Sequence, residues 1–197
     1  MAMNIVGLIG WSVGWVALLW VSLQTPNWAV WVFMPYFIYG PYRALTQVKY
    51  FPAAFLMLRI LRTYPWRVER NVARGLTKRP EVMGKQYGWF EFSNPANRSQ
   101  RLPLVFSQHL RTEWWSRRMA PRAKPRLKGD IEIMWFAGDP RFIGLVAAPT
   151  RKGTAPRRLH VVEQRTDARS GWRFADWGAT PDDIERGRRA GVYPVHP

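Results

Sequence analysis

The stretch Asp130–Ala147, DIEIMWFAGDPRFIGLVA, indicates the fold of the second part of the chain more clearly than any other segment. Two short apolar runs, 130–136 and 142–147, flank a segment, 137–141, that contains Gly, Asp and Pro. Turn-forming residues between two apolar runs are typical of an antiparallel β-hairpin. The stretch therefore predicts two paired strands joined by a tight turn.

Further short strands are expected on both sides of this hairpin. With them the chain has about six strand-like segments, separated by Gly and Pro, which favours a small antiparallel sandwich or a partly open barrel. The segments outside the hairpin are Trp66–Arg70, Trp89–Ser93, Leu102–Phe106 and Leu159–Gln164.

Two helices are expected among these strands. One is a short helix over His109–Arg118. The other lies near the C-terminus, where Thr180 can cap a helix that starts at Pro181 and Gly191 can end it. The sequence thus predicts a β-rich domain over residues 64–197 that closes with a short C-terminal helix.

Charge divides the chain sharply. Residues 1–42 contain no charged side chain, Arg43 is the first, and Glu69 is the first acidic residue. The chain has 30 Lys and Arg residues against 13 Asp and Glu residues, a net charge of +17, so the β-rich domain is strongly basic. The chain has no Cys, which excludes disulfides, thiolate metal sites and cysteine nucleophiles.

Two apolar runs fill the uncharged segment. Asn4–Leu23 has about 20 residues, enough to cross the bilayer core, and Trp28–Tyr42 is shorter and contains two prolines. Thr25 could cap a second helix that starts at Pro26. We expect a transmembrane helical hairpin over residues 1–45 and an α+β fold class for the whole chain. A cleaved signal peptide and a re-entrant second segment are the alternatives.

The cations that follow the apolar runs predict the orientation. Arg43, Lys49, Arg59 and Arg62 all precede the first acidic residue and could anchor the chain at the interface. The positive-inside rule then places the C-terminal domain in the cytoplasm and makes the chain a multi-pass protein of the inner (plasma) membrane. Residues 46–63 are expected to form an amphipathic interfacial linker helix, or else the first buried helix of the domain.

A stripe of small residues runs along the first apolar segment. Its members are Gly7, Gly10, Gly14 and Ala17. Such a face lets helices approach closely. We expect it to pack against the second helix, with a homodimer contact as the alternative.

Two clusters of cations are the candidate binding residues. Blocks of like charge repel one another unless a polyanion neutralises them, and for a tethered domain the nearest polyanion is the anionic leaflet. Nucleic acid is the competing partner, with Trp114, Trp115, Trp172 and Trp177 as stacking candidates. A solvated surface or a membrane protein partner is the third reading. The first cluster, expected to be a long loop, comprises Arg117, Arg118, Arg122, Lys124, Arg126 and Lys128. The second comprises Arg151, Lys152, Arg157 and Arg158.

Motifs for catalysis are not found in the sequence. His109, His160 and His196 stand apart, and HExxH, phosphate-loop and GxSxG patterns do not occur. Asp130 and Glu132 are expected to share one face of a strand, where they more simply offset neighbouring arginines. We therefore expect no enzymatic activity, no metal and no cofactor.

Two short stretches carry a resemblance to a group of proteins. Leu61–Trp66 (LRTYPW) and Trp135–Phe142 (WFAGDPRF) resemble segments of uncharacterised small membrane proteins of actinobacteria. The resemblance implies an N-terminal hydrophobic hairpin and a basic cytoplasmic domain, and it implies no activity. Together these patterns predict a non-enzymatic anchor or accessory subunit whose basic domain associates with anionic lipid or a membrane protein partner.

Overall fold

A computed structural model of the chain describes residues 2–26, 28–76, 88–106, 112–150, 153, 155–164 and 176–192. The chain divides into two compact units, Met1–Phe55 and Leu56–Pro197. The boundary falls within helix α3 (Tyr50–Thr63), inside the segment expected to be a linker.

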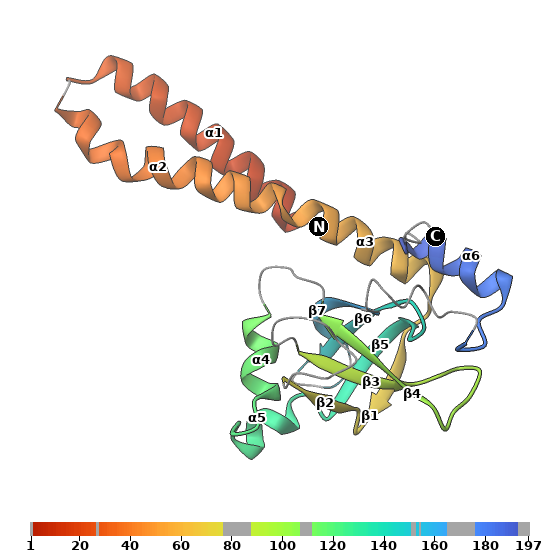
Figure 1. Cartoon of the computed structure of the whole chain (residues 1–197). Helices are drawn as coiled ribbons and strands as arrows, with labels where there is room; N and C mark the ends of the chain where they lie inside the picture. The colour runs from red at the N-terminus through yellow and green to blue at the C-terminus, as the bar shows by residue number, and fades with distance from the viewer. Residues whose placement is uncertain are drawn as a thin grey trace. The chain divides into compact units, whose positions relative to one another are not determined.

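The first unit contains a helical hairpin formed by α1 (Ala2–Gln24) and α2 (Ala29–Val48) (Figure 1). Aromatic contacts hold the two helices antiparallel. The ring of Trp11 stacks on Tyr36 with their centroids 5.4 Å apart, and Trp15 Nε1 donates to the carbonyl of Phe37 at 3.3 Å. A Cβ on Gly7 would lie 2.8 Å from Gln47 Nε2, which places the start of α1 beside the end of α2.

Helix α2 corrects one detail of the expected hairpin. It begins at Ala29 after an N-cap at Trp28, and not at Pro26 after Thr25. It remains one helix of 20 residues although Pro35 and Pro41 each remove a backbone hydrogen bond. Neighbouring helices can compensate for such losses in apolar surroundings.

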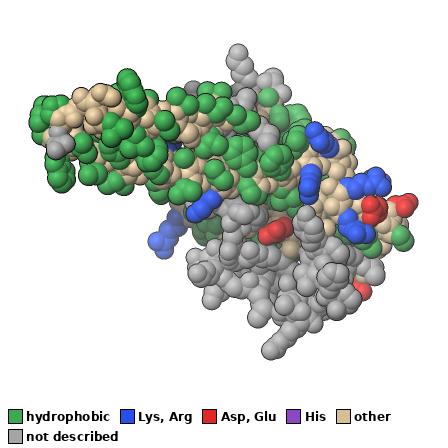
Figure 2. All heavy atoms as spheres, turned by 90° about the horizontal axis from the view of Figure 1, so that it is seen from above, with side chains coloured by type: hydrophobic (Ala, Val, Ile, Leu, Met, Phe, Trp, Pro, Cys, Tyr) green, Lys and Arg blue, Asp and Glu red, His purple; other side chains and the backbone are tan. Residues whose placement is uncertain are grey.

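Among the described helices, α1 alone is long and apolar enough to cross a membrane. Its segment Ile5–Gln24 has 20 residues and a mean hydropathy of 1.9, and a signal sequence would have the same properties. The structure therefore supports one candidate span and does not show the expected multi-pass hairpin. Helix α2 is less apolar because its second half contains Arg43, Thr46 and Gln47. Figure 2 shows hydrophobic side chains over much of the visible surface of α1 and α2.

The second unit is built on one antiparallel sheet that curls into an open half-barrel. Its strand order is β1-β5-β6-β7-β4-β3-β2, so β1 and β2 form its two edges. Of the two predicted architectures, the open barrel is thus the closer. The strands are β1 (Arg67–Arg70), β2 (Ala73–Gly75), β3 (Trp89–Ser93), β4 (Arg101–Phe106), β5 (Ile133–Asp139), β6 (Ile143–Pro149) and β7 (Pro156–Glu163).

Helices cover both faces of the sheet and create two cores. On one face, Trp115 and Met119 of α4 (Glu113–Met119) pack on Phe90, Phe106 and other strand residues. On the other, Ile60 of α3 and Ala190 of α6 (Pro181–Ala190) pack on Leu145 and its neighbours. Figure 1 shows α4 and the short α5 (Pro125–Gly129) at one end of the sheet and α6 at the other.

Helix α3 contributes to the second core with one of its faces. Ile60 is fully buried, and Leu56 and Leu61 pack against the same cluster, whereas Phe55 and Leu58 are exposed. The second half of α3 is therefore the first buried helix of the second unit, which was the alternative reading of residues 46–63.

The two ends of α6 confirm the expected C-terminal helix. Thr180 and Asp183 form a reciprocal capping box at its start. Gly191 ends it with a φ of 105°, and a Cβ there would lie 2.5 Å from Leu56 Cδ1. The local sequence signals at both ends were therefore sufficient to predict where α6 begins and ends.

Two expected strand features were wrong in detail, and one strand was missed. Strand β5 starts at Ile133 because Asp130–Glu132 forms a turn after α5, so Asp130 and Glu132 do not share a strand. The β5–β6 turn is correspondingly later, at 140–142. The three-residue strand β2 was not predicted at all.

A substitution at Gly138 tests how closely strands β5 and β6 pack in their hairpin. Gly138 has a φ of 148° and faces Gly144, and an added Cβ would lie 2.4 Å from Gly144 Cα and from the carbonyl oxygen of Ile143. Because these atoms are backbone and cannot move aside, Gly138→Ala should lower the free energy of unfolding by about 2–4 kcal/mol. Unfolding of the full chain in detergent, followed by near-UV circular dichroism, measures this change.

Gly129→Ala is the matched control, because nothing lies within 4 Å of the corresponding Cβ position. It should change stability by less than about 1 kcal/mol. Equal destabilisation by the two substitutions would contradict the close approach of β5 and β6 at Gly138.

Candidate functional site

The first predicted cluster of cations lies on two short helices, not on a long loop. Arg117 and Arg118 belong to the last turn of α4, and Arg126 and Lys128 to α5. Ala120, in an extended conformation, ends α4, and Pro125 occupies the first turn of α5, where its missing N–H removes no hydrogen bond. The cations are therefore carried by ordered backbone.

Arg74, which the sequence did not single out, fixes this helical segment to the sheet. Its Nη1 donates to the carbonyl of Ile131 and its Nη2 to the carbonyl of Lys128, at 3.0 Å for the latter. Burial lowers the pKa of Arg74, and the charge of Glu132 acts against this effect. Lys128 Nζ in turn donates to the carbonyl of Pro121 at 3.0 Å. Arg74 and Lys128 thus hold the segment in place.

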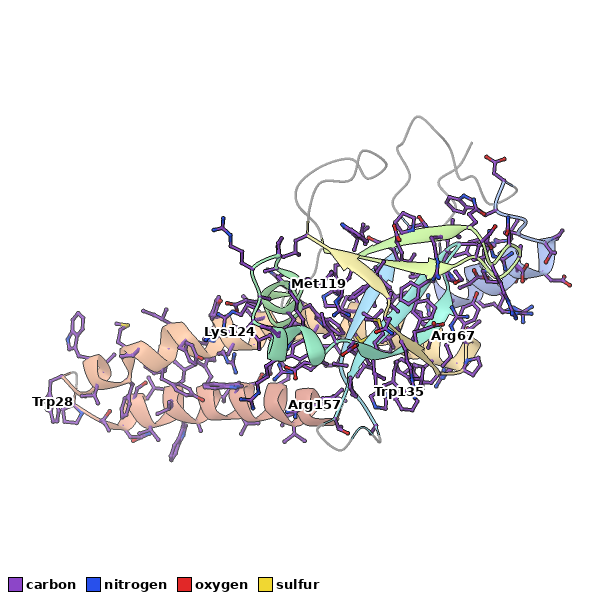
Figure 3. The ribbon with its side chains drawn as sticks, turned by 90° about the horizontal axis from the view of Figure 1, so that it is seen from below. Trp28, Arg67, Met119, Lys124, Trp135 and Arg157 are labelled. Atoms are coloured by element: carbon purple, nitrogen blue, oxygen red, sulfur yellow. The ribbon has the colours of Figure 1, made fainter. Side chains whose placement is uncertain are left out.

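The structure brings parts of both clusters to a single groove of about 1240 Å³ in the second unit. We call it the basic groove. Figure 3 labels Lys124, before α5, and Arg157, in β7, which line it. Its charged lining comprises the cations Arg70, Arg118, Lys124, Arg126, Arg157 and Arg158 and the acids Asp130 and Glu132.

Within the groove, Trp114 is covered by guanidinium groups. The Cζ atom of Arg118 lies 3.8 Å from the centroid of the Trp114 ring, and that of Arg158 lies 5.3 Å from it. Arg118 also forms an ion pair with Asp130, with Nη2 and Oδ2 2.9 Å apart. Stacking and ion pairing therefore give Arg118 a fixed orientation.

A β-bulge positions Arg158. Val146 pairs with His160 and Ala148 with Arg157, so that two residues of β7 oppose one residue of β6. Arg158 takes the left-handed conformation, with a φ of 58°, and its carbonyl accepts from Trp115 Nε1 at 3.2 Å. A non-glycine residue in this region is strained, and bulges often re-aim side chains beside functional sites. The strained residue, Arg158, lies in the wall of the groove.

The predicted stacking tryptophans are not open platforms. Trp114 lies under the arginines, Trp115 is 1% exposed, and Trp177 packs against the second core. Trp172 lies outside the described residues. The arrangement around Trp114 is therefore suited to holding arginines and not to stacking nucleotide bases.

The remaining predicted cations lie apart from the groove or outside the described residues. Arg117 pairs with Glu113 on the exposed side of α4, and Arg122 is exposed in the turn after α4. Arg151 and Lys152 fall among the residues that the structure does not describe. Of the described cations in the two predicted clusters, Arg117, Arg122 and Lys128 thus do not line the groove.

The predicted interfacial cations are divided between the two units. Arg43 lies over the rings of Trp11 and Tyr39, at 6.0 and 5.8 Å from their centroids. Lys49, Arg59 and Arg62 are exposed.

The small residues of α1 do not act as one face. A Cβ on Gly7 would lie 2.8 Å from Gln47 Nε2, and one on Gly14 would lie 2.7 Å from the Tyr36 hydroxyl. Gly10 has open space around it, and Ala17 is exposed. Gly7 and Gly14 therefore lie against α2.

A second polar cluster joins the β5–β6 turn to α6. Arg141, 4% exposed, contacts Asp139 at 2.6 Å and Asp183 at 3.0 Å, and its Nη1 donates to the carbonyl of Gly178 at 3.0 Å. Burial alone would lower the pKa of Arg141, but hydrogen bonds and the charges of both aspartates raise it. Burial also raises the pKa of the nearby Tyr64, whose hydroxyl has no hydrogen-bond partner among the described residues. Arg141 and the two aspartates are paired with one another in this cluster, which fastens α6 to the sheet.

Groups suited to catalysis or metal binding do not converge in the described residues. His160 is buried in β7 against the ring of Phe106, 4.7 Å between centroids. Asp130 pairs with Arg118 and Asp139 with Arg141, so these carboxylates have separate partners. No group of three His, Asp or Glu residues that could hold a metal ion occurs in this part of the chain. His109 and His196 lie outside it.

Comparison with protein-family models, curated proteins and solved structures finds no match to the chain. The resemblance to small actinobacterial membrane proteins therefore stays a prediction. A function for this chain has to be argued from the basic groove itself.

The Arg141 cluster generates a pH prediction. Burial raises the pKa of Asp183, but hydrogen bonds from Thr180 and the charge of Arg141 lower it by more. The pKa of Asp183 therefore lies below the ordinary value of 3.8. A carboxylate with a depressed pKa in the folded state stabilises the fold fully above its unfolded pKa and loses that contribution as the pH falls through the folded pKa. The melting temperature should therefore decrease as the pH is lowered through the range below about pH 4. Asp183→Asn should weaken this pH dependence and should lower the stability at neutral pH.

Thermal unfolding of the full chain in detergent between neutral pH and pH 3 tests this expectation. Asp182→Asn, an exposed neighbour in the same helical turn, is the control. The role given to Asp183 is wrong if both variants show the same acid profile.

Proposed function

We propose that this protein is a non-enzymatic membrane anchor or accessory subunit whose basic groove associates with the anionic surface of its own membrane. The observation that carries the proposal is the convergence of parts of both predicted clusters on one groove. Six cations and two carboxylates line it, and Asp130 is already paired with Arg118. The groove therefore has an excess of positive charge that an anionic surface can neutralise.

Because the domain would be tethered to the membrane, weak contacts are sufficient for its association with the lipid surface. Each cation near an anionic leaflet contributes on the order of 1 kcal/mol, and such contacts are screened within about 10 Å at moderate salt. A membrane helix in the same chain keeps the groove at a high effective concentration near the lipid. Among the described residues of the groove, Arg118 is the one cation that forms an ion pair. The other five cations can therefore approach anionic lipid without the loss of an existing ion pair.

The proposal includes a topology. In it α1 spans the membrane, α2 returns, and the second unit lies in the cytoplasm. Support comes from the apolar length of α1, from the antiparallel packing of α2 on α1, and from the cations at and after the end of α2. Arg43 can reach the interface from α2 by extending its side chain.

Cysteine labelling tests this topology, because the chain has no native Cys. Gln24→Cys and Arg98→Cys, both exposed positions, would be labelled separately with a membrane-impermeant maleimide in bacterial cells. We expect labelling of Cys at position 24 in intact cells and at position 98 only after permeabilisation. Labelling at position 98 in intact cells would contradict the cytoplasmic placement and favour a signal sequence or a single span.

Hydrogen exchange tests the surface association. The full chain would be placed in nanodiscs of phosphatidylcholine alone or mixed with anionic phosphatidylglycerol. Amides of α4 and α5 should exchange about threefold or more slowly in the anionic discs, and high salt should remove the difference.

The matched variants carry equal changes of charge. Lys124→Gln with Arg126→Gln should abolish the difference between the discs, whereas Arg188→Gln with Arg189→Gln on the exposed face of α6 should retain it. The proposal fails if α4 and α5 exchange equally in both kinds of disc. If slower exchange requires a co-purified protein or nucleic acid, and not lipid, the groove binds that partner and not the membrane surface.

A further inference from the structure

The basic groove also contains exposed apolar side chains. Val68 is 48% exposed and Ile133 is 43% exposed, and both line the groove. In the described part of the second unit, Leu58 is the one other large apolar side chain exposed by more than a third. Exposed apolar side chains that lie together and are rimmed by polar residues are a feature of binding surfaces.

These apolar side chains lie next to a groove cation on one face of the sheet. In the β1–β5 pair, Arg70 lies opposite Ile133, and Val68 is two residues before Arg70 on the same face. Leu127 of α5 adds a half-buried apolar side chain to the lining. The groove therefore has an apolar part formed by the β1–β5 pair and α5, beside its cationic part.

The cationic part contains two arginines whose orientation is fixed before any ligand binds. Arg118 is held by Trp114 and Asp130, and Arg158 is placed by the β-bulge. Oriented guanidinium groups match the geometry of phosphate oxygens and lose little entropy on binding them. Arg157, from the same strand as Arg158, adds a further cation.

From this combination, and resting on the function proposed above, we infer that the groove binds one molecule of an anionic phospholipid. Its phosphate lies between Arg118, Arg157 and Arg158, and the first part of an acyl chain lies along Val68 and Ile133. The volume of about 1240 Å³ exceeds the roughly 300–1,000 Å³ of ordinary small-molecule sites, so it has room for both parts of an amphiphile. A free phosphate would leave the apolar side chains in water, and phosphatidylcholine, whose phosphate is offset by its own quaternary ammonium, would bring a further cation into a groove that already has an excess of them.

Native mass spectrometry of the full chain in detergent tests the inference. The probes are phosphatidylglycerol, phosphatidylcholine and glycerol phosphate, the last of which carries a phosphate without an acyl chain. We expect one phosphatidylglycerol per chain at concentrations where phosphatidylcholine and glycerol phosphate are not retained. Equal retention of both lipids, or no preference for the lipid over glycerol phosphate, overturns the inference.

Two pairs of variants separate the charged from the apolar contacts. Arg158→Asn removes the cation but keeps a residue that tolerates the left-handed conformation, and it should weaken phosphatidylglycerol binding about tenfold. Arg189→Gln, on the exposed face of α6, is its control and should leave binding unchanged. Ile133→Thr keeps a good strand former and should weaken binding about threefold, whereas Leu58→Gln, the exposed apolar residue outside the groove, should not.

The results distinguish this inference from the proposed function. If exchange of α4 and α5 slows in anionic nanodiscs but no lipid is retained in a one-to-one ratio, surface association stands and the single-lipid site is wrong. If a lipid is retained but the groove variants bind it as well as their controls do, the lipid lies elsewhere, for example on α1 and α2, and the groove site is again wrong. Absence of both effects removes the proposed function together with the inference.

Discussion

Two-sided burial of the β5–β6 hairpin is the constraint on which the second unit depends. In β6, Val146 faces the core under α4, while Leu145 faces the core under α3 and α6. A strand that is apolar on both faces has to be covered on both sides. Helices therefore pack on each side of a single curled sheet, and the sheet does not need a second sheet to bury it. The basic groove is lined where residues of α4 and α5 lie beside the ends of β1 and β6 and the starts of β5 and β7.

Local signals in the sequence were reliable where the cause of the structure is local. The capping residues of α6, the strand Trp89–Ser93 and the β5–β6 hairpin were all predicted from residues that are close in sequence. Features that depend on distant partners were not predicted. Strand β2 exists through its pairing with β3, and the α4–α5 segment is fixed by Arg74, which is more than fifty residues earlier. The second apolar segment forms a helix as expected, but composition alone does not make it a span.

The same distinction applies to the site. Charge patterning identified Arg118, Lys124, Arg126, Arg157 and Arg158, but it also included Arg117 and Lys128, which have internal partners. It missed Arg70, Val68 and Ile133, because only the pairing of β1 with β5 brings them to the groove. Arg158 carries no local signal for a positive φ, since Gly or Asn is the usual residue there. Several guanidinium groups hold the fold together, so the net charge of the chain overstates the charge available to a ligand.

The sheet order has a consequence for synthesis of the chain. Strand β1 (RVER) is made directly after the N-terminal helices, but β5, its one partner among the described strands, follows about sixty residues later. At ribosomal rates of roughly 5–20 residues per second, β1 is exposed for about 3–12 s as an unpaired strand. Three of its four residues are charged, which discourages pairing with a wrong strand during that interval. The edge strand is thus protected by its own composition while the nascent domain is incomplete.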